Sequence, residues 1–221
     1  METESKSSRR YIEQFNPDVE VLNNEHQDFL HKFNAGSGYE NFNSFISEEA
    51  LESATDGDGV TYLIWNVFYD SNHNELKREL VSYYTLSATA IPYIDRIRRD
   101  PDEAERYGSE FDEQICGIPA LEIKMFAVDT KYQDLFFCYE NEVLPISAWI
   151  LRGIIDYAEY LLTNTLGLKA IFLHALPNAE KFYYDNGFRY IKINMQPLHC
   201  VDSEYSSMYL SLRNVIMNYD S

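Results

Sequence analysis

The sequence has 221 residues, of which 45% are hydrophobic and 24% are charged, as is ordinary for a globular protein. This length is sufficient for one domain with a sizeable core. The net charge of −18 argues against nonspecific attraction to nucleic-acid backbones or anionic membranes. It either favours cationic small molecules and basic peptides as partners or forms a solvated surface that aids solubility.

Sparse cysteines and the lack of long apolar stretches indicate a cytoplasmic protein. Cys116, Cys138 and Cys200 lie far apart without metal-ligand spacing, which fits a reducing compartment. We find no apolar segment that matches a signal peptide or a membrane span. The five histidines also lack ligand spacing, so we expect no metal site.

The first part of the chain predicts a short strand, a helix and two paired strands. The short strand is expected over residues 19–22, and apolar residues at helical spacing predict a helix over residues 39–54. The run DGDG at 56–59 ends this helix and starts a hairpin. Its strands are expected over residues 60–69 and 79–90.

The next part predicts a strand over residues 120–128, a long loop and an amphipathic helix. Apolar residues recur at helical spacing from Ile150 to Leu162, with charged residues turned outward. Ser147 is suited to be the N-cap of this helix, and Gly167 follows its last apolar residues.

The last part predicts three strands and a short helix. One strand is expected over residues 169–176, and Pro177 suits the first turn of the helix that follows. That helix ends at the glycine of NGF (186–188), and residues 189–195 and 205–212 are expected as closing strands.

Three stretches of this core are EIKMFAVD (122–129), KYQ (131–133) and AEKFYYDNGF (179–188). In them, and in the order of its elements, the chain resembles the GNAT superfamily of acyl-CoA N-acyltransferases. The resemblance implies a mixed α/β (α+β) fold with a mostly antiparallel central sheet flanked by helices. It implies one domain over residues 1–221, with a charged insertion at about 93–117.

The insertion is rich in charge, and Pro101 directly after Asp100 fits the start of a helix. We interpret the segment as a solvated helix and loop. It is equally suited to overhang the acceptor side of an active site and to tune what enters, and the sequence does not decide between these interpretations.

The resemblance implies acetyl-CoA as co-substrate. The strand backbone would hold the pantetheine arm, and the N-terminus of the following helix would receive the pyrophosphate. The cofactor-binding residues implied in this way are Phe126, Ala127, Val128, Gln133, Ile146, Ser147 and Ala148.

The phosphate-binding loop departs from the family pattern. Asp134 and Phe136 stand where glycines would follow Gln133, and about ten more residues precede the helix. Glu140 and Glu142 in this stretch would oppose a phosphate. The sequence therefore predicts a remodelled anion site.

The resemblance also implies two catalytic residues. Tyr183, four residues after Ala179, would donate a proton to the departing thiolate; the alternative is an aromatic core residue. Glu122 matches the position of a general-base glutamate, and the alternative is a surface or ion-paired strand residue. Tyr184 points elsewhere on the helix and serves as a local control.

The leading interpretation is an N-acetyltransferase that moves an acetyl group from acetyl-CoA to a primary amine by direct attack in a ternary complex. The acceptor would be a small-molecule or peptide amine, with a cationic one favoured by the charge. Two alternatives remain: a toxin-like enzyme acting on aminoacyl-tRNA, and a catalytically degenerate binding or regulatory protein. We expect no membrane partner, and a homodimer stays open.

Overall fold

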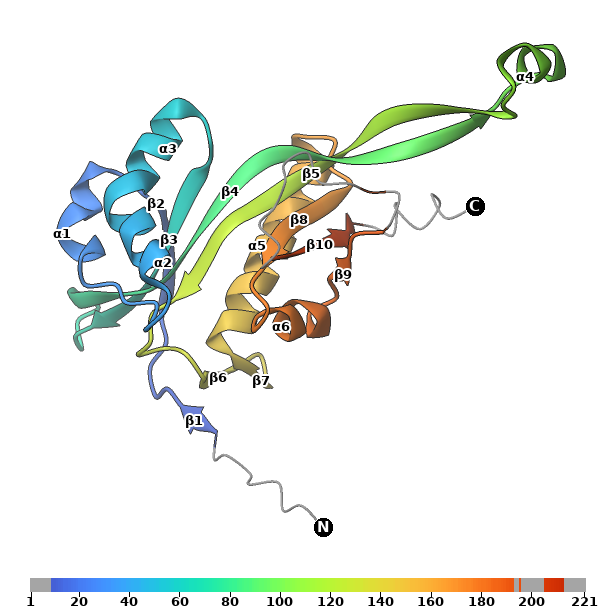
Figure 1. Ribbon diagram of the computed structural model, residues 1–221. Coiled ribbons are helices and arrows are strands. Elements are labelled where there is room, and N and C mark those ends of the chain that lie inside the picture. The colour runs from blue at the N-terminus through green and yellow to red at the C-terminus, as the bar shows by residue number, and fades with distance from the viewer. Residues whose placement is uncertain (1–8, 193–194, 196–204, 213–221) are drawn as a thin grey trace. The chain divides into compact units, whose positions relative to one another are not determined.

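The computed structural model describes residues 9–192, 195 and 205–212, which fold as two compact units (Figure 1). The first unit comprises Met1–Ser87 and Lys124–Asp156, and the second comprises Ala88–Ile123 and Tyr157–Ser221. Three elements continue from one unit into the other along the chain: β4 (Glu75–Arg98), β5 (Phe111–Val128) and α5 (Ile146–Asn164).

The first unit contains an antiparallel sheet in the order β2–β3–β4, with β2 at its edge. Helical segments cover one face of it, and their apolar side chains form a core with Leu63, Trp65 and Tyr83 of the sheet. These elements are β2 (Pro17–Val21), η1 (Asn24–His26), α1 (Gln27–Leu30), α2 (Glu40–Ser44), the π-helical η2 (Phe45–Glu49), α3 (Ala50–Asp56) and β3 (Val60–Tyr69).

A small sheet also belongs to the first unit, with the order β1 (Arg10–Tyr11), β6 (Leu135–Tyr139) and β7 (Glu142–Pro145). The long loop predicted before α5 is therefore wrong, because β6 and β7 form a hairpin. Phe137 packs edge-on against Phe15 and Trp149, at 4.8 and 5.9 Å between ring centroids. This packing compensates for the absence of glycines at the turn.

The second unit contains β5, β8, β10 and β9 in that order. β5 and β8 are parallel, and the other two pairings are antiparallel. The remaining elements are α4 (Pro101–Tyr107), β8 (Ala170–Ala175), α6 (Glu180–Asp185), β9 (Arg189–Tyr190) and β10 (Ser206–Ser211). A core forms around Ile91, Ile118, Phe172 and Tyr209.

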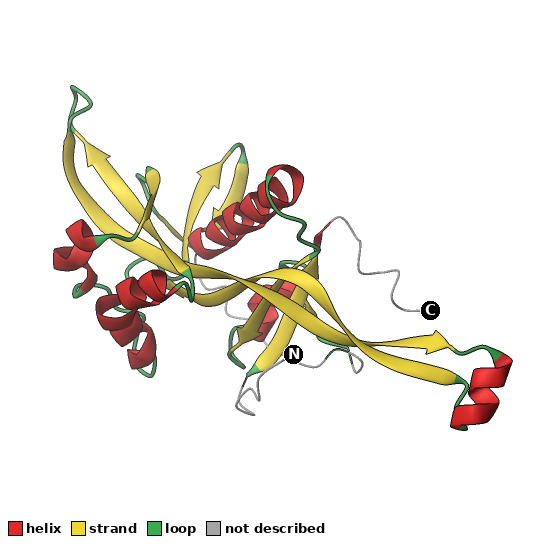
Figure 2. Cartoon of the chain, turned by 90° about the horizontal axis from the view of Figure 1, so that it is seen from above, coloured by secondary structure: helices red, strands yellow, loops and turns green. Residues whose placement is uncertain are grey.

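The charged segment at 93–117 is mostly strand rather than helix and loop. α4 begins at the predicted place, with Asp100 as N-cap accepting the Glu103 N–H at 2.9 Å. However, β4 continues to Arg98 and β5 begins at Phe111, and the two form a ribbon that ends in α4 (Figure 2). Arg96–Glu113 and Arg99–Asp112 ion pairs connect these segments, and pattern analysis of one strand cannot detect such pairs.

The fold class predicted from the sequence is confirmed: helices flank mostly antiparallel strands. The strands predicted at 60–69, 169–176 and 205–212 are confirmed, whereas the one at 79–90 is much longer than predicted. Of the closing strand at 189–195, only Arg189–Tyr190 is observed, and residues 193–194 lie outside the described residues, as does Cys200.

The N-cap prediction for Ser147 is wrong, because α5 begins at Ile146 and Ser147 lies in its first turn. The strand β7 runs directly into the helix, which places the boundary earlier than the side-chain pattern indicates. Among the described helices, none has the length and apolar character required to cross a membrane.

The β6–β7 turn gives a prediction about stability. Glu140 and Asn141 both have positive φ, 47° and 69°, as a type I′ turn requires. Glutamate is poorly suited to this conformation, whereas Asn-Gly is the preferred pair. We expect the double variant Glu140→Asn/Asn141→Gly to raise the free energy of unfolding by about 0.5–1 kcal/mol, measured by urea denaturation. A loss of stability would show that Glu140 makes a contact that outweighs its backbone strain.

Candidate active site

The predicted site residues are distributed between the two units. Tyr183 and Glu122 belong to the second unit. The predicted cofactor-binding residues belong to the first unit and are Phe126, Ala127, Val128, Gln133, Ile146, Ser147 and Ala148.

β5 pairs with β8 only over Ala120–Ile123, so its last five residues have β4 on one side and no β8 partner on the other. The Ala127 carbonyl accepts the Ser82 hydroxyl at 2.6 Å, and the Asp129 N–H donates to the Val81 carbonyl at 2.8 Å. Asp129 is buried, and its carboxylate accepts N–H groups of Asn34 and Lys131 at 3.0 and 2.9 Å. The turn after β5 is therefore firmly held.

Gln133 supports this turn instead of presenting a free amide. Its side-chain nitrogen donates to the carbonyls of Val128 at 2.8 Å and Ala35 at 3.0 Å. One of the two lone pairs of the Val128 carbonyl is thus already used. A role of Gln133 in cofactor binding stays a prediction.

The N-terminus of α5 follows β7 without a loop. The first N–H groups of a helix have no partner within it, and the helix dipole favours an anion there. Glu142, which was expected to oppose a phosphate, forms an ion pair with Arg152 of α5 at 3.0 Å. Arg152 therefore offsets part of the unfavourable charge, although both side chains are exposed and the pair is screened by solvent.

Tyr183 lies in α6 with only 8% of its surface exposed. Its ring packs edge-on against Phe182 and Phe188, at 5.2 and 5.6 Å between centroids. Burial raises the pKa of its hydroxyl far above the ordinary value, so the group is protonated at neutral pH. Among the described residues the hydroxyl has no hydrogen-bond partner, and it is not one of the fully enclosed polar atoms.

Glu180 connects α6 to the adjacent strands and was not predicted as a functional residue. Its carboxylate accepts hydrogen bonds from Ser206 at 2.5 Å and from Tyr190 at 2.6 Å. These bonds lower the pKa of Glu180 below its ordinary value. Because Glu180 stands three residues before Tyr183, this connection fixes the helix that carries the tyrosine.

Glu122 is half-buried on β5 and lies opposite Phe172 of β8. It therefore shares a sheet face with apolar side chains of the second unit's core, such as Ala120 and Phe172. His174 of β8 is hydrogen-bonded within the second unit, with Nδ1 at 2.9 Å from the Ser207 hydroxyl of β10.

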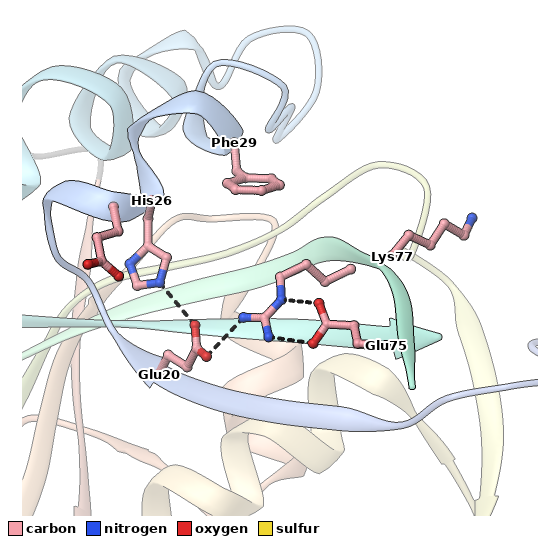
Figure 3. Close-up of a pocket in the computed structure, with 7 residues that line it drawn as sticks. Glu20, His26, Phe29, Glu75 and Lys77 are labelled. Atoms are coloured by element: carbon pink, nitrogen blue, oxygen red, sulfur yellow. Dashed lines mark hydrogen bonds and ion pairs between the residues drawn. The ribbon is translucent and has the colours of Figure 1, made fainter. Parts of the chain in front are cut away.

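A separate pocket of about 550 Å³ lies in the first unit, at a place where the sequence predicted no site (Figure 3). Arg78 is its centre: the guanidinium donates twice to Glu75 and once to Glu20, at 2.7–2.9 Å. His26 Nδ1 accepts the Asn23 N–H, so Nε2 donates to Glu20 at 2.9 Å. The pocket is lined by Glu20, Glu25, His26, Phe29, Glu75, Lys77 and Arg78.

The Arg78 cluster predicts an acid-sensitive contribution to stability. Burial acts to raise the pKa of Glu20, but the bonds from Arg78 and His26 outweigh it, so this pKa is lowered. The contribution is therefore complete above the unfolded pKa of about 4.3 and is lost as pH falls through the folded pKa.

We expect Arg78→Met to reduce the free energy of unfolding by roughly 1–3 kcal/mol at neutral pH. The difference from the parent should shrink below about pH 4, as thermal unfolding at several pH values would show. Arg96→Met breaks an exposed ion pair and is the matched control, with little effect expected. A pH-independent difference for Arg78→Met would assign its effect to packing against Trp65 instead.

Comparison with known proteins identifies similar structures but no similar sequence. No family model matches the chain, and no curated protein matches its sequence. The structure of AtaTR bound with acetyl-CoA has a TM-score of 0.58 at 16% identity, with 89% of this chain and 94% of that chain covered. AtaT complexed with acetyl-methionyl-tRNAfMet gives 0.56 at 16% identity, with 92% and 99% covered.

A KacT variant with one tyrosine replaced by phenylalanine is also similar, with a TM-score of 0.56 at 15% identity and 88% and 94% covered. AtaT and KacT are toxins with the GNAT fold. The GNAT-like fold implied by the sequence resemblance is therefore confirmed over most of the chain. At this identity the likeness concerns the fold.

Proposed function

We propose that this protein is an N-acetyltransferase that transfers an acetyl group from acetyl-CoA to a primary amine. The observation that carries the proposal is Tyr183, a buried phenol whose hydroxyl has no partner among the described residues. This hydroxyl makes no hydrogen bond to a described residue that would stabilise the fold. Expulsion of a thiolate, in contrast, needs a proton donor of this kind. The similarity of the fold to AtaTR bound with acetyl-CoA supports the same chemistry.

The residues of the first unit fit an acyl-CoA in two respects. β5 runs on from Ile123, where its pairing with β8 ends, to Val128, which leaves strand backbone for a pantetheine amide. The N-terminus of the long helix α5 offers N–H groups to a pyrophosphate, and Arg152 offsets Glu142 beside it. When bound, acetyl-CoA supplies the activated acetyl group.

The chain's own residues then carry the proton transfers. Glu122, directly or through water, takes a proton from the ammonium so that the neutral amine can form the new C–N bond. As the C–S bond breaks, the Tyr183 hydroxyl gives its proton to the departing sulfur. Its raised pKa keeps that proton in place until the thiolate charge develops.

An aminoacyl-tRNA amine is a second candidate acceptor, because AtaT complexed with acetyl-methionyl-tRNAfMet shares this fold over 92% of the chain. The net charge of −18 opposes it, since affinity for a polyanion depends on neutralising phosphates. A panel containing amines, basic peptides and aminoacyl-tRNA, each assayed at low and moderate salt, separates these acceptors.

Tyr183→Phe tests the proposed proton donor. The change keeps the packing against Phe182 and Phe188 but removes the hydroxyl. We expect turnover to fall roughly 10²–10⁴-fold, with the affinity for acetyl-CoA nearly unchanged. Tyr184→Phe is the matched control: that ring is exposed and lies 4.4 Å from the Arg189 guanidinium, a contact phenylalanine retains. Equal, small effects at both positions would make Tyr183 a core aromatic only.

Ser147→Asp tests the pyrophosphate site at the start of α5. A carboxylate in the first turn stabilises the helix but repels a phosphate from the same N–H groups. We expect the variant to unfold at the parent's temperature or above it and to bind acetyl-CoA about tenfold more weakly, measured by thermal shift and titration. Unchanged binding would place the pyrophosphate elsewhere. If the parent shows no shift with millimolar acetyl-CoA, the degenerate binding protein replaces the enzyme.

A further inference from the structure

The edge strand β2 has three features that point to a partner in extended conformation: an edge that pairs with no described strand, one apolar face and one acidic face. It pairs with β3 on one side, and no described strand pairs with its other side. The Leu22 N–H donates to Thr61 and the Val67 N–H donates to Asn16, so alternate residues of β2 face β3. The peptide groups of Val19 and Val21 consequently face outward.

This edge is protected at its start, where β2 begins with Pro17, but not at its end. Natural edges are blocked by lysines, bulges, prolines within the strand or covering segments. In β2 the Asp18 carboxylate accepts the Val19 N–H at 3.0 Å, but nothing described occupies the N–H of Val21. An added strand could therefore accept a hydrogen bond from the Val21 N–H.

The two faces of the sheet at this edge differ in chemistry. Val19, Val21 and Val60 share one face, since Val19 and Val21 lie opposite Ile64 and Tyr62, and they are 49%, 51% and 41% exposed. Asp18 and Glu20 lie on the other face, and Glu20 lines the pocket together with Glu25 and Glu75 (Figure 3). One face is thus apolar and the other acidic.

The basic side chains at the pocket do not neutralise all of its carboxylates. Arg78 is shared by Glu20 and Glu75, and Lys77 is paired with Glu79 at 2.9 Å. The Glu25 carboxylate has no partner among the described residues. A cation entering from the edge would therefore meet uncompensated negative charge at Glu25.

We propose that the free edge of β2 binds an extended, basic segment of another protein by strand addition, with alternate basic and apolar side chains. Its basic residues lie on the face of Asp18 and Glu20, and its apolar residues cover Val19 and Val21. Main-chain hydrogen bonds to the Val21 N–H and to the Val19 and Val21 carbonyls provide affinity, and the two faces provide specificity.

A second copy of this chain fits the edge less well. In the antiparallel registers that overlap most of β2, Glu20 falls opposite the second copy's Asp18 or Glu20. Like charges directly opposite one another destabilise a strand pair. Charge complementarity therefore selects a basic partner.

The fluorescence of Trp65 reports peptide binding at this edge. Its ring lies beneath the pocket, with the centroids of His26 and Phe29 at 5.7 and 5.4 Å and the Arg78 guanidinium at 5.5 Å. The chain has two tryptophans, so Trp149→Phe leaves Trp65 as the only indole fluorophore. The probe is a blocked heptapeptide of alternating lysine and valine, and its control has glutamate in place of lysine.

We expect the Lys–Val peptide to change Trp65 fluorescence saturably, more strongly at low salt, and the Glu–Val peptide to bind at least tenfold more weakly. Val21→Pro removes an outward N–H without disturbing the β3 ladder and should weaken binding about three- to tenfold. Glu25→Gln should weaken it less, and mainly at low salt.

A peptide with N-methylated valines tests the main-chain bonds without altering the protein, and N-methylated lysines are its control. In an antiparallel pairing, loss of binding is expected only for methylated valines, whose N–H groups would face β2. The proposal is overturned if millimolar Lys–Val peptide does not bind, if the Glu–Val peptide binds equally, or if methylated valines bind like the parent peptide. Sedimentation showing a dimer that Val21→Pro dissociates would also overturn it, in favour of self-pairing.

Discussion

The end of β5 imposes the constraint on which the surrounding structure depends. A strand that stops pairing with its neighbour must satisfy its peptide groups in another way or leave them to solvent and ligands. Here Ser82 serves the Ala127 carbonyl and Gln133 serves the Val128 carbonyl, while Asp129 holds the turn that follows. Together with the neighbouring strand β4, whose Val81 carbonyl accepts the Asp129 N–H, these bonds hold the end of β5 in place after its pairing with β8 stops. The proposed acyl-CoA site needs a backbone that is fixed in this way.

Periodicity and punctuation in the sequence predict which elements exist. Gly57 ends α3 with a φ of 80°, as the DGDG run indicated, and α5 and β8 follow their apolar patterns. Lengths and connections are less predictable because they depend on partners. β4 and β5 are long because they pair with each other along the ribbon, and aromatic packing by Phe137 accompanies a hairpin whose turn lacks glycine.

The same limit applies to the candidate site. A helix bearing a tyrosine four residues after an alanine is visible in the sequence, so Tyr183 could be selected. The residues that hold the predicted site positions within each unit could not, because their partners are distant in sequence. Gln133 bonds to Ala35 in the first unit, and Glu180 bonds to Ser206 in the second. The sequence pattern likewise does not distinguish Arg78 from other strand arginines. Only the structure shows that it bonds to both Glu20 and Glu75. No local pattern records such contacts.

Buried tyrosines in this protein show what a structural hydroxyl looks like. The Tyr83 hydroxyl donates to the Phe42 carbonyl and the Tyr132 hydroxyl to Glu79, both at 2.7 Å. Each bond satisfies a polar group that burial would otherwise penalise by about 1–3 kcal/mol. Tyr183 is 8% exposed, against 0% for Tyr83 and 5% for Tyr132, and no described residue accepts from its hydroxyl, which is not fully enclosed. Solvent therefore reaches this hydroxyl without a large burial penalty, and the same opening gives a ligand from solution access to it, as the proposed role of Tyr183 requires.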